Sequence, residues 1–238
     1  MAEANWNIMG GSLTSGNVKR GVTAGVDKPS GGGNYVYGFN SVNASPGSVA
    51  LYTSQASFVP TAKGGSVRAA VRRGPSASPS GCSCYVFIGA QGASTADNGY
   101  MLGLSDSDPS ALVLRKGLIS AGIVDGDIGD SGILAKSTAT WAEGTWLHIR
   151  LDQIVNPSGD VVLRVYMNDL DVNAVNSPLW EAVEGLTAAA EGAAFIDDSL
   201  GINSGSSPFA AGYIGYGFQV SGLSRRAFFD HVAISRQT

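Results

Sequence analysis

Two neighbouring segments in the middle of the chain alternate strictly between apolar and other positions. In residues 146–152 the odd-numbered positions carry Leu, Ile and Leu, and the even-numbered ones carry Trp, His, Arg and Asp. Residues 161–168 alternate in the same way, with Val, Leu, Val and Met at the odd positions. Between them, residues 156–160 (Asn-Pro-Ser-Gly-Asp) supply turn residues. A period of two on both sides of a turn predicts an antiparallel hairpin with one face in a core.

Other short apolar runs follow one another along the chain, each bounded by Gly, Pro, Asn, Asp or Ser, the residues that supply turn geometry. These runs cover residues 35–40, 48–53, 66–72, 84–89, 100–105, 112–116, 213–220 and 227–236. About ten strands at this spacing predict an all-β protein, built as a two-sheet antiparallel β-sandwich or jelly roll. No repeat period is visible, which argues against a propeller or solenoid.

The length of 238 residues fits a single sandwich domain. Residues 1–34 are rich in Gly, Ser and Asn. We interpret them as an N-terminal arm that leans on the body or on a neighbouring subunit; the alternative is a loop-rich entry into the first strand. Residues 35–238 are then one β-sandwich domain.

Two segments interrupt the pattern of strands. Residues 118–142 carry several Gly and Asp and predict a long surface excursion. Residues 177–201 hold helix signals, with Ser177 as a cap and Pro178 at the first helical position. We therefore expect short helical insertions in the loops, which is where a β-sandwich usually makes its contacts.

Charge and cysteine content narrow the function. The formal charge is −4, with 15 basic and 19 acidic residues, which argues against binding to nucleic acid or to an anionic membrane, because phosphates are bound by clustered Lys and Arg. No run of about 18 apolar residues is present. The first residues show neither the basic region nor the apolar region of a secretory signal, so none is expected. We expect a protein made in a cytoplasm, with Cys82 and Cys84 as two buried or half-buried thiols.

Catalytic patterns are missing. The five Glu do not form the paired carboxylates of a jelly-roll glucanase, and the Gly-x-Ser-x-Gly motif of a serine hydrolase does not occur. His148 and His231 each stand alone within a predicted strand. The expectation is a protein that is not an enzyme.

One acidic group has the carboxylate density of a calcium loop. Asp125, Asp127 and Asp130 lie close together in the sequence, and calcium prefers oxygen ligands from loops. An EF-hand would place an acidic ligand at the twelfth position, where Lys136 stands. These three aspartates are the candidate metal ligands, and no other cofactor is expected.

Aromatic residues near loops and strand ends could form a platform for a glycan. The candidates are Trp141, Trp180, Tyr213 and Tyr216. Burial in the sandwich core is the competing explanation, because Trp and Tyr bury large areas.

The hairpin, together with the closing strand Phe228-Phe-Asp-His-Val, resembles the concanavalin A-like jelly roll, in particular its laminin-G-like members. More widely, the chain resembles virion structural proteins of tailed bacteriophages. The segments that carry this resemblance are 20–25, 37–41, 100–106, 113–117, 195–201 and 225–231.

The phage resemblance implies an accessory component of a phage particle, on the tail, collar or baseplate or as capsid decoration on the head exterior. Its partners would be other virion proteins and further copies of itself, as a homo-oligomer, and it would be assembled in the host cytoplasm. A low charged fraction, 14%, leaves surface for such contacts. The resemblance supplies no site residues. The alternative is a lectin-like carbohydrate-binding module used for attachment to the host surface.

Overall fold

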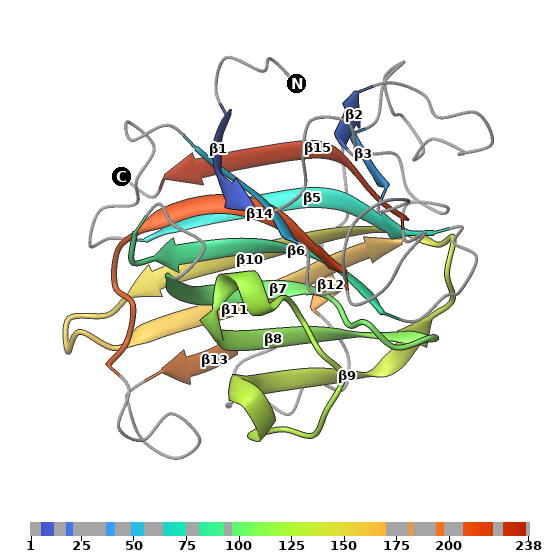
Figure 1. Cartoon of the computed structure of the whole chain (residues 1–238). Coiled ribbons are helices and arrows are strands. Elements are labelled where there is room, and N and C mark those ends of the chain that lie inside the picture. Colours follow the sequence, from blue (N-terminus) through green and yellow to red (C-terminus); the bar gives the residue numbers. More distant parts are fainter. Residues whose placement is uncertain are drawn as a thin grey trace.

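The computed structural model of the chain is a sandwich of two antiparallel sheets (Figure 1). Backbone and side chains are described for residues 64–74, 81–92, 97–130, 132–167, 195–197, 207–219 and 227–235, and backbone alone for the remaining strand residues and residue 131. All statements about structure refer to these residues.

The first sheet has seven described strands. In spatial order they are β1 (Trp6–Gly11), β4 (Val49–Ser54), β14 (Tyr213–Val220), β6 (Cys82–Ala90), β7 (Asn98–Leu104), β8 (Ser110–Leu118) and β9 (Ile133–Trp141). Two short 3-10 turns, η3 (Ile119–Ala121) and η4 (Asp130–Gly132), lie between β8 and β9 in the sequence. β6, β7, β8 and β9 are neighbours joined in sequence order, whereas β14 enters from the C-terminal part of the chain.

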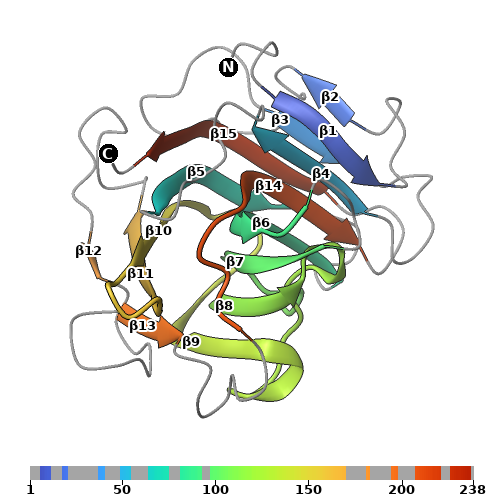
Figure 2. The same ribbon diagram turned by 90° about the vertical axis from the view of Figure 1, so that its left-hand side faces the viewer.

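The second sheet has eight described strands and lies against the first (Figure 2). Their order is β12 (Glu181–Ala182), β11 (Val161–Asp169), β10 (Trp146–Val155), β5 (Gly65–Arg73), β15 (Arg226–Arg236), β3 (Tyr37–Asn40) and β2 (Val18–Arg20), with β13 (Ala194–Asp197) also paired to β11. β15 thus lies between strands from the first third of the chain.

The predicted hairpin is confirmed as β10 and β11, which pair from Leu147 to Val155. The apolar positions of both strands face the space between the sheets, where Leu147, Ile149 and Leu163 are fully buried. The connecting turn is closed by Asn156, whose side-chain oxygen accepts a hydrogen bond from the Asp160 backbone N–H at 2.9 Å.

Strand β6, in the middle of the first sheet, is buried on both of its faces. Val86 and Ile88 of β6 pack between the two sheets, whereas Tyr85 and Phe87 point outward into a second apolar cluster. That cluster includes Ile119, Ile123 and Ile133, because η3 and the segment that follows it cross this outer face (Figure 1). All nine residues of β6 are buried, which explains why its sequence is a continuous apolar run.

Three parts of the chain differ from the sequence-based predictions. The end of the expected surface excursion is an edge strand, β9, whose Ala, Ser and Thr residues hide the strand pattern. Residues 181–182, inside the predicted helix, form strand β12. Within the predicted N-terminal arm, β1 pairs with β4 and β2 pairs with β3, so these parts are strands of the sandwich. The rest of residues 1–34 lies outside the described residues.

The two cysteines form no disulfide and are buried in β6. Burial raises the pKa of the Cys84 thiol to about 12, with the charge of Arg73 acting in the opposite direction. A thiol with so high a pKa is protonated at neutral pH and therefore a poor nucleophile. No described helix is long and apolar enough to cross a membrane.

Candidate functional site

The outer face of the second sheet holds a shallow groove, called here the arginine groove. It is formed by β5, β10 and β15 and has a volume of about 210 Å³. The lining residues are Ser66, Arg68, Arg150, Ala233, Ile234 and Ser235. The groove is open on one side.

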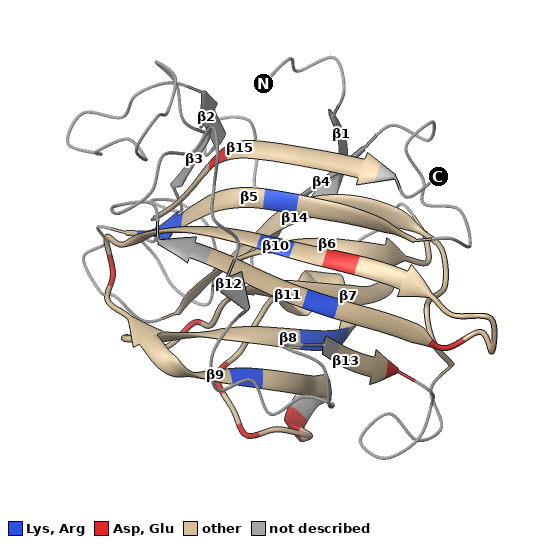
Figure 3. Cartoon of the chain, turned by 180° about the vertical axis from the view of Figure 1, so that it is seen from behind, with Lys and Arg blue, Asp and Glu red and all other residues tan. Residues whose placement is uncertain are grey.

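Strand register gathers these side chains from distant parts of the sequence. Arg150 of β10 lies opposite Arg68 of β5 on one side and opposite Tyr166 of β11 on the other. Asp152 lies opposite Ser66 and Arg164 in the same way. Because alternate residues of these strands fill the core, the positions between them face outward. Figure 3 shows basic positions on the neighbouring strands β5, β10 and β11, with an acidic position on β10.

Arg150 is held in a fixed orientation by its neighbours. Its Nε donates to Asp152 Oδ1 at 2.7 Å and its Nη2 donates to Asp152 Oδ2 at 2.6 Å. Its guanidinium lies 5.1 Å from the ring centroid of Tyr166. The hydrogen bonds that Arg150 donates to Asp152 raise the pKa of Arg150, against the opposing effect of burial. The Asp152 side chain is 6% exposed and that of Arg150 33%, so the pair presents one accessible, oriented guanidinium.

Arg68 is exposed beside this pair. Among the described residues, no ion pair joins Arg68 or Arg164 to a carboxylate. Two like charges directly opposite each other on adjacent strands destabilise a sheet, and Arg68 and Arg150 stand in that relation. The groove therefore carries an excess of positive charge.

A histidine pair flanks the groove at one end. His148 of β10 is 1% exposed, and its ring centroid lies 6.3 Å from that of His231. Burial, followed by the charges of Arg68 and His231, lowers the pKa of His148 to about 4. His148 is therefore neutral at physiological pH. His231 lies in a bulge of β15 at a φ of 49°, with its Nδ1 3.5 Å from Asp230 Oδ2.

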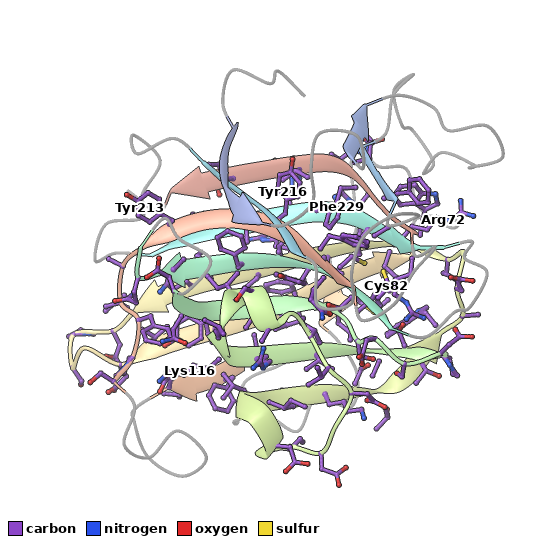
Figure 4. All side chains as sticks on the ribbon, viewed as in Figure 1. Arg72, Cys82, Lys116, Tyr213, Tyr216 and Phe229 are labelled. Carbon is purple, nitrogen blue, oxygen red and sulfur yellow. The ribbon has the colours of Figure 1, made fainter. Side chains whose placement is uncertain are left out.

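The three described members of the predicted aromatic platform do not come together. Tyr216 is 1% exposed and packs between the sheets, with its ring centroid 5.1 Å from that of Phe229, so its prediction as a glycan ligand is wrong. The reason is the alternation of β14, which turns even-numbered positions inward. Trp141 and Tyr213 are half-buried and pack against two different apolar clusters. Figure 4 shows Tyr213 at the end of β14, away from Tyr216 and Phe229. Trp180 lies outside the described residues.

The predicted calcium ligands do not converge either. Asp125 Oδ1 lies 2.6 Å from Lys136 Nζ, which also donates to the Gly126 carbonyl oxygen at 3.1 Å. Asp130 Oδ2 instead accepts a hydrogen bond from the Asp127 backbone N–H at 3.3 Å. No three His, Cys, Asp or Glu side chains of the described residues are grouped to hold a metal. The lysine ammonium supplies the positive charge in this loop.

A second polar cluster is enclosed between the sheets. Asp197 Oδ2 of β13 lies 2.6 Å from Lys116 Nζ of β8 and accepts a hydrogen bond from the Tyr100 hydroxyl at 2.5 Å. That hydroxyl accepts one from the Phe209 backbone N–H at 2.9 Å. Lys116 and Asp197 are almost completely buried. The cluster joins the two sheets and offers no surface to a ligand.

Neither the arginine groove nor this cluster was among the site residues predicted from the sequence. Arg150 and Asp152 do alternate with the apolar positions of the hairpin, which is a visible signal for an outward polar face. The partner Arg68 comes from a strand far earlier in the chain, and only the β5–β10 register places it opposite Arg150.

Comparisons with known proteins identify the fold. No protein-family model matches the chain, and no curated protein matches its sequence. Among solved structures, it is similar to the carbohydrate binding module CBM66 from Bacillus subtilis, with 11% identity, a TM-score of 0.50 and coverage of 97% of this chain and 95% of that chain. It is also similar to the Ca²⁺-bound exoplasmic/lumenal domain of VIP36, with 11% identity, a TM-score of 0.51 and coverage of 98% and 84%. The legume lectin-like domain from Entamoeba histolytica matches at 9% identity with a TM-score of 0.46, over 99% of this chain and 91% of that chain.

Identities this low show the fold alone. The expected all-β, two-sheet, concanavalin A-like jelly roll is confirmed.

Proposed function

We propose that this protein is a non-catalytic carbohydrate-binding module that binds a glycan in the arginine groove. The observation that carries the proposal is the oriented pair of Arg150 and Asp152 on an outward sheet face. Sugar hydroxyls both donate and accept hydrogen bonds, and this face sets guanidinium donors beside the hydroxyls of Ser66 and Ser235. Few, well-placed polar groups of this kind fix the orientation of a small ligand.

The solved structures of similar fold support the same reading. CBM66 is by its name a carbohydrate binding module, and it shares the sandwich over almost the whole chain. Fold alone does not decide function, so the weight of the proposal rests on the groove.

The proposal is tested with a glycan array, followed by calorimetric titration of each glycan that binds. Arg150→Gln removes the oriented guanidinium and is expected to weaken binding by about tenfold or more, the loss of about 1.4 kcal/mol. Lys136→Gln is the matched control, because it removes one positive charge from β9 of the other sheet. Equal affinity of the two variants would show that the groove is not the binding site.

The resemblance to phage virion proteins remains a separate proposal. We infer from it a component of a phage particle, and a carbohydrate-binding module on such a particle would serve attachment to the host surface. Immunogold labelling of purified particles, with copy number from quantitative mass spectrometry, tests the location. Absence from the particles would reject the virion proposal and leave the carbohydrate-binding proposal intact.

A further inference from the structure

We propose that the arginine groove selects glycans that carry carboxylates, and that Arg68 is the residue that pairs with the acid group. This inference rests on the proposed carbohydrate-binding function and specifies its ligand class.

The local charge of the sheet face favours an anionic ligand. Among the described residues, the strand register brings Arg68, Arg150 and Arg164 beside Asp152 on this face, and the neighbouring β15 adds the carboxylate of Asp230 at the end with the histidine pair. The chain as a whole carries a formal charge of −4, so this face has the opposite sign to the protein. A local positive face attracts anionic ligands.

The two arginines of the groove differ in what they contact. Two donors of Arg150 are already directed at Asp152, which fixes this guanidinium within the sheet face. Arg68 is exposed on the neighbouring strand, and no carboxylate of the described residues forms an ion pair with it. A planar guanidinium can bind a carboxylate through two parallel hydrogen bonds. A bound acid group would also relieve the repulsion between Arg68 and Arg150 across the strands.

The shape of the groove favours a short stretch of a longer glycan. Its volume of about 210 Å³ is below the 300–1,000 Å³ typical of a pocket that encloses a drug-sized ligand. Ser66, Ala233 and Ser235 have small side chains, which leave open space beside the arginines. Such a groove suits one or two sugar units of a longer chain, with the polymer continuing across the open side. Ser66 and Ser235 then contact hydroxyls while Arg68 contacts the acid.

The test compares acidic polysaccharides with the same polymers after each carboxylate has been reduced to an alcohol. Polygalacturonate, alginate and hyaluronate are used in both forms, beside neutral glucans, mannans and galactans, in affinity gels and calorimetric titrations. We expect binding to at least one acidic polymer, weakened about tenfold or more by carboxyl reduction and progressively weakened by NaCl. Arg68→Gln should reproduce the loss with the acidic polymer, Arg68→Lys should recover it only in part, and Lys136→Gln should leave it unchanged.

The contrary results are distinct. Equal binding to the native and the carboxyl-reduced polymer, or unchanged binding by Arg68→Gln, would overturn this inference and leave the proposed function standing. Binding to no glycan of the panel would overturn the proposed function itself. Equal affinity for double-stranded DNA would show an unselective basic surface and would also overturn the inference.

Discussion

The outer faces of the two sheets differ in the side chains that they carry and in how far these are buried. On the first sheet, the outward side chains of Tyr85, Phe87 and Met101 are apolar and fully buried, because the chain crosses over them between β8 and β9. On the second, the outward positions next to the groove carry arginines, an aspartate and a tyrosine, whereas the outward Trp146 and His148 at the start of β10 are buried. Both sheets share one apolar core between them.

This difference teaches where to look for function in such a fold. Apolar side chains on an outer face that the chain itself covers stabilise the fold and are not accessible to a ligand. Fully exposed charges on an outer face add little stability, since exposed ion pairs contribute about 0–1 kcal/mol. The Arg150–Asp152 pair is the exception, because its carboxylate is only 6% exposed. Arginines placed opposite each other even oppose folding. The proposed ligand would account for their presence on the second sheet.

The largest expected effect lies on the apolar side. Phe87→Ala should destabilise the protein by about 3–5 kcal/mol, the usual cost of removing a buried Phe. Tyr166→Ala removes an aromatic ring from the outer face of the second sheet and should cost clearly less, because Tyr166 is only half-buried. Urea denaturation measures both free energies of unfolding. Equal losses would contradict the contrast between the two faces.

The next effect is the pH dependence of stability that His148 confers. The unfolded chain protonates this histidine near pH 6.5, whereas the folded protein does so only near pH 4, since its pKa is lowered to about 4. The unfolded state therefore binds more protons between these values, so stability is complete above pH 6.5 and falls by up to about 3 kcal/mol as the pH drops to 4.

Denaturation of the wild type and His148→Gln across this pH range measures the contribution. In the variant, the part of the pH dependence of the unfolding free energy that His148 contributes should be absent. The difference between the two proteins also separates His148 from Asp230, whose carboxyl pKa is raised, mainly by burial. An identical slope in both proteins would contradict the assignment.

A smaller effect is expected from the carboxylate under the groove. Asp152→Asn removes the charge that orients Arg150 and should cost about 1–3 kcal/mol, the range for hydrogen bonds to charged groups. Glycan affinity should fall with it, because Arg150 is then no longer fixed. Asp127→Asn, an exposed carboxylate at the other sheet, is the control and should change neither quantity. Loss of stability with full glycan affinity would mean that Asp152 serves the fold alone.

The smallest effect on stability should come from Arg68. Arg68→Gln is expected to change the free energy of unfolding by no more than about 0.5 kcal/mol, with a slight gain favoured because one of two opposed like charges is removed. Thermal and urea denaturation check this at low salt. A loss above about 1 kcal/mol would reveal a structural role for Arg68 and weaken its assignment to the ligand.

The sequence predicted the fold well because most strands follow simple rules of alternation. The hairpin of β10 and β11 is visible from residues 146–152 and 161–168 alone. Strand β9 was missed because its exposed half, Thr138 to Thr140, lacks large apolar residues at every second position. Strands β12 and β13 are too short to show a period.

The site was much harder to predict. Pairing order is not written in local sequence, so nothing indicated that Arg68 would lie opposite Arg150. Composition also misled, because aromatic residues such as Tyr216 were weighed as glycan ligands although burial in the core is their commoner fate. The aspartates between Asp125 and Asp130 suggested calcium, and Lys136 eleven residues after Asp125 was the sign that this loop already holds a cation.

The positions of β14 and β15 have a consequence for how the protein is made. β14 lies between β4 and β6, and β15 lies between β5 and β3. Neither sheet is continuous before residues 213–236 have left the ribosome, so the emerging chain cannot close its sandwich step by step. Folding then depends on pairings between distant segments, which are slow to form. During that interval, β4, β5 and β6 expose unpaired edges to other chains. Cutting the chain before residue 213 would remove the middle of both sheets, not their border.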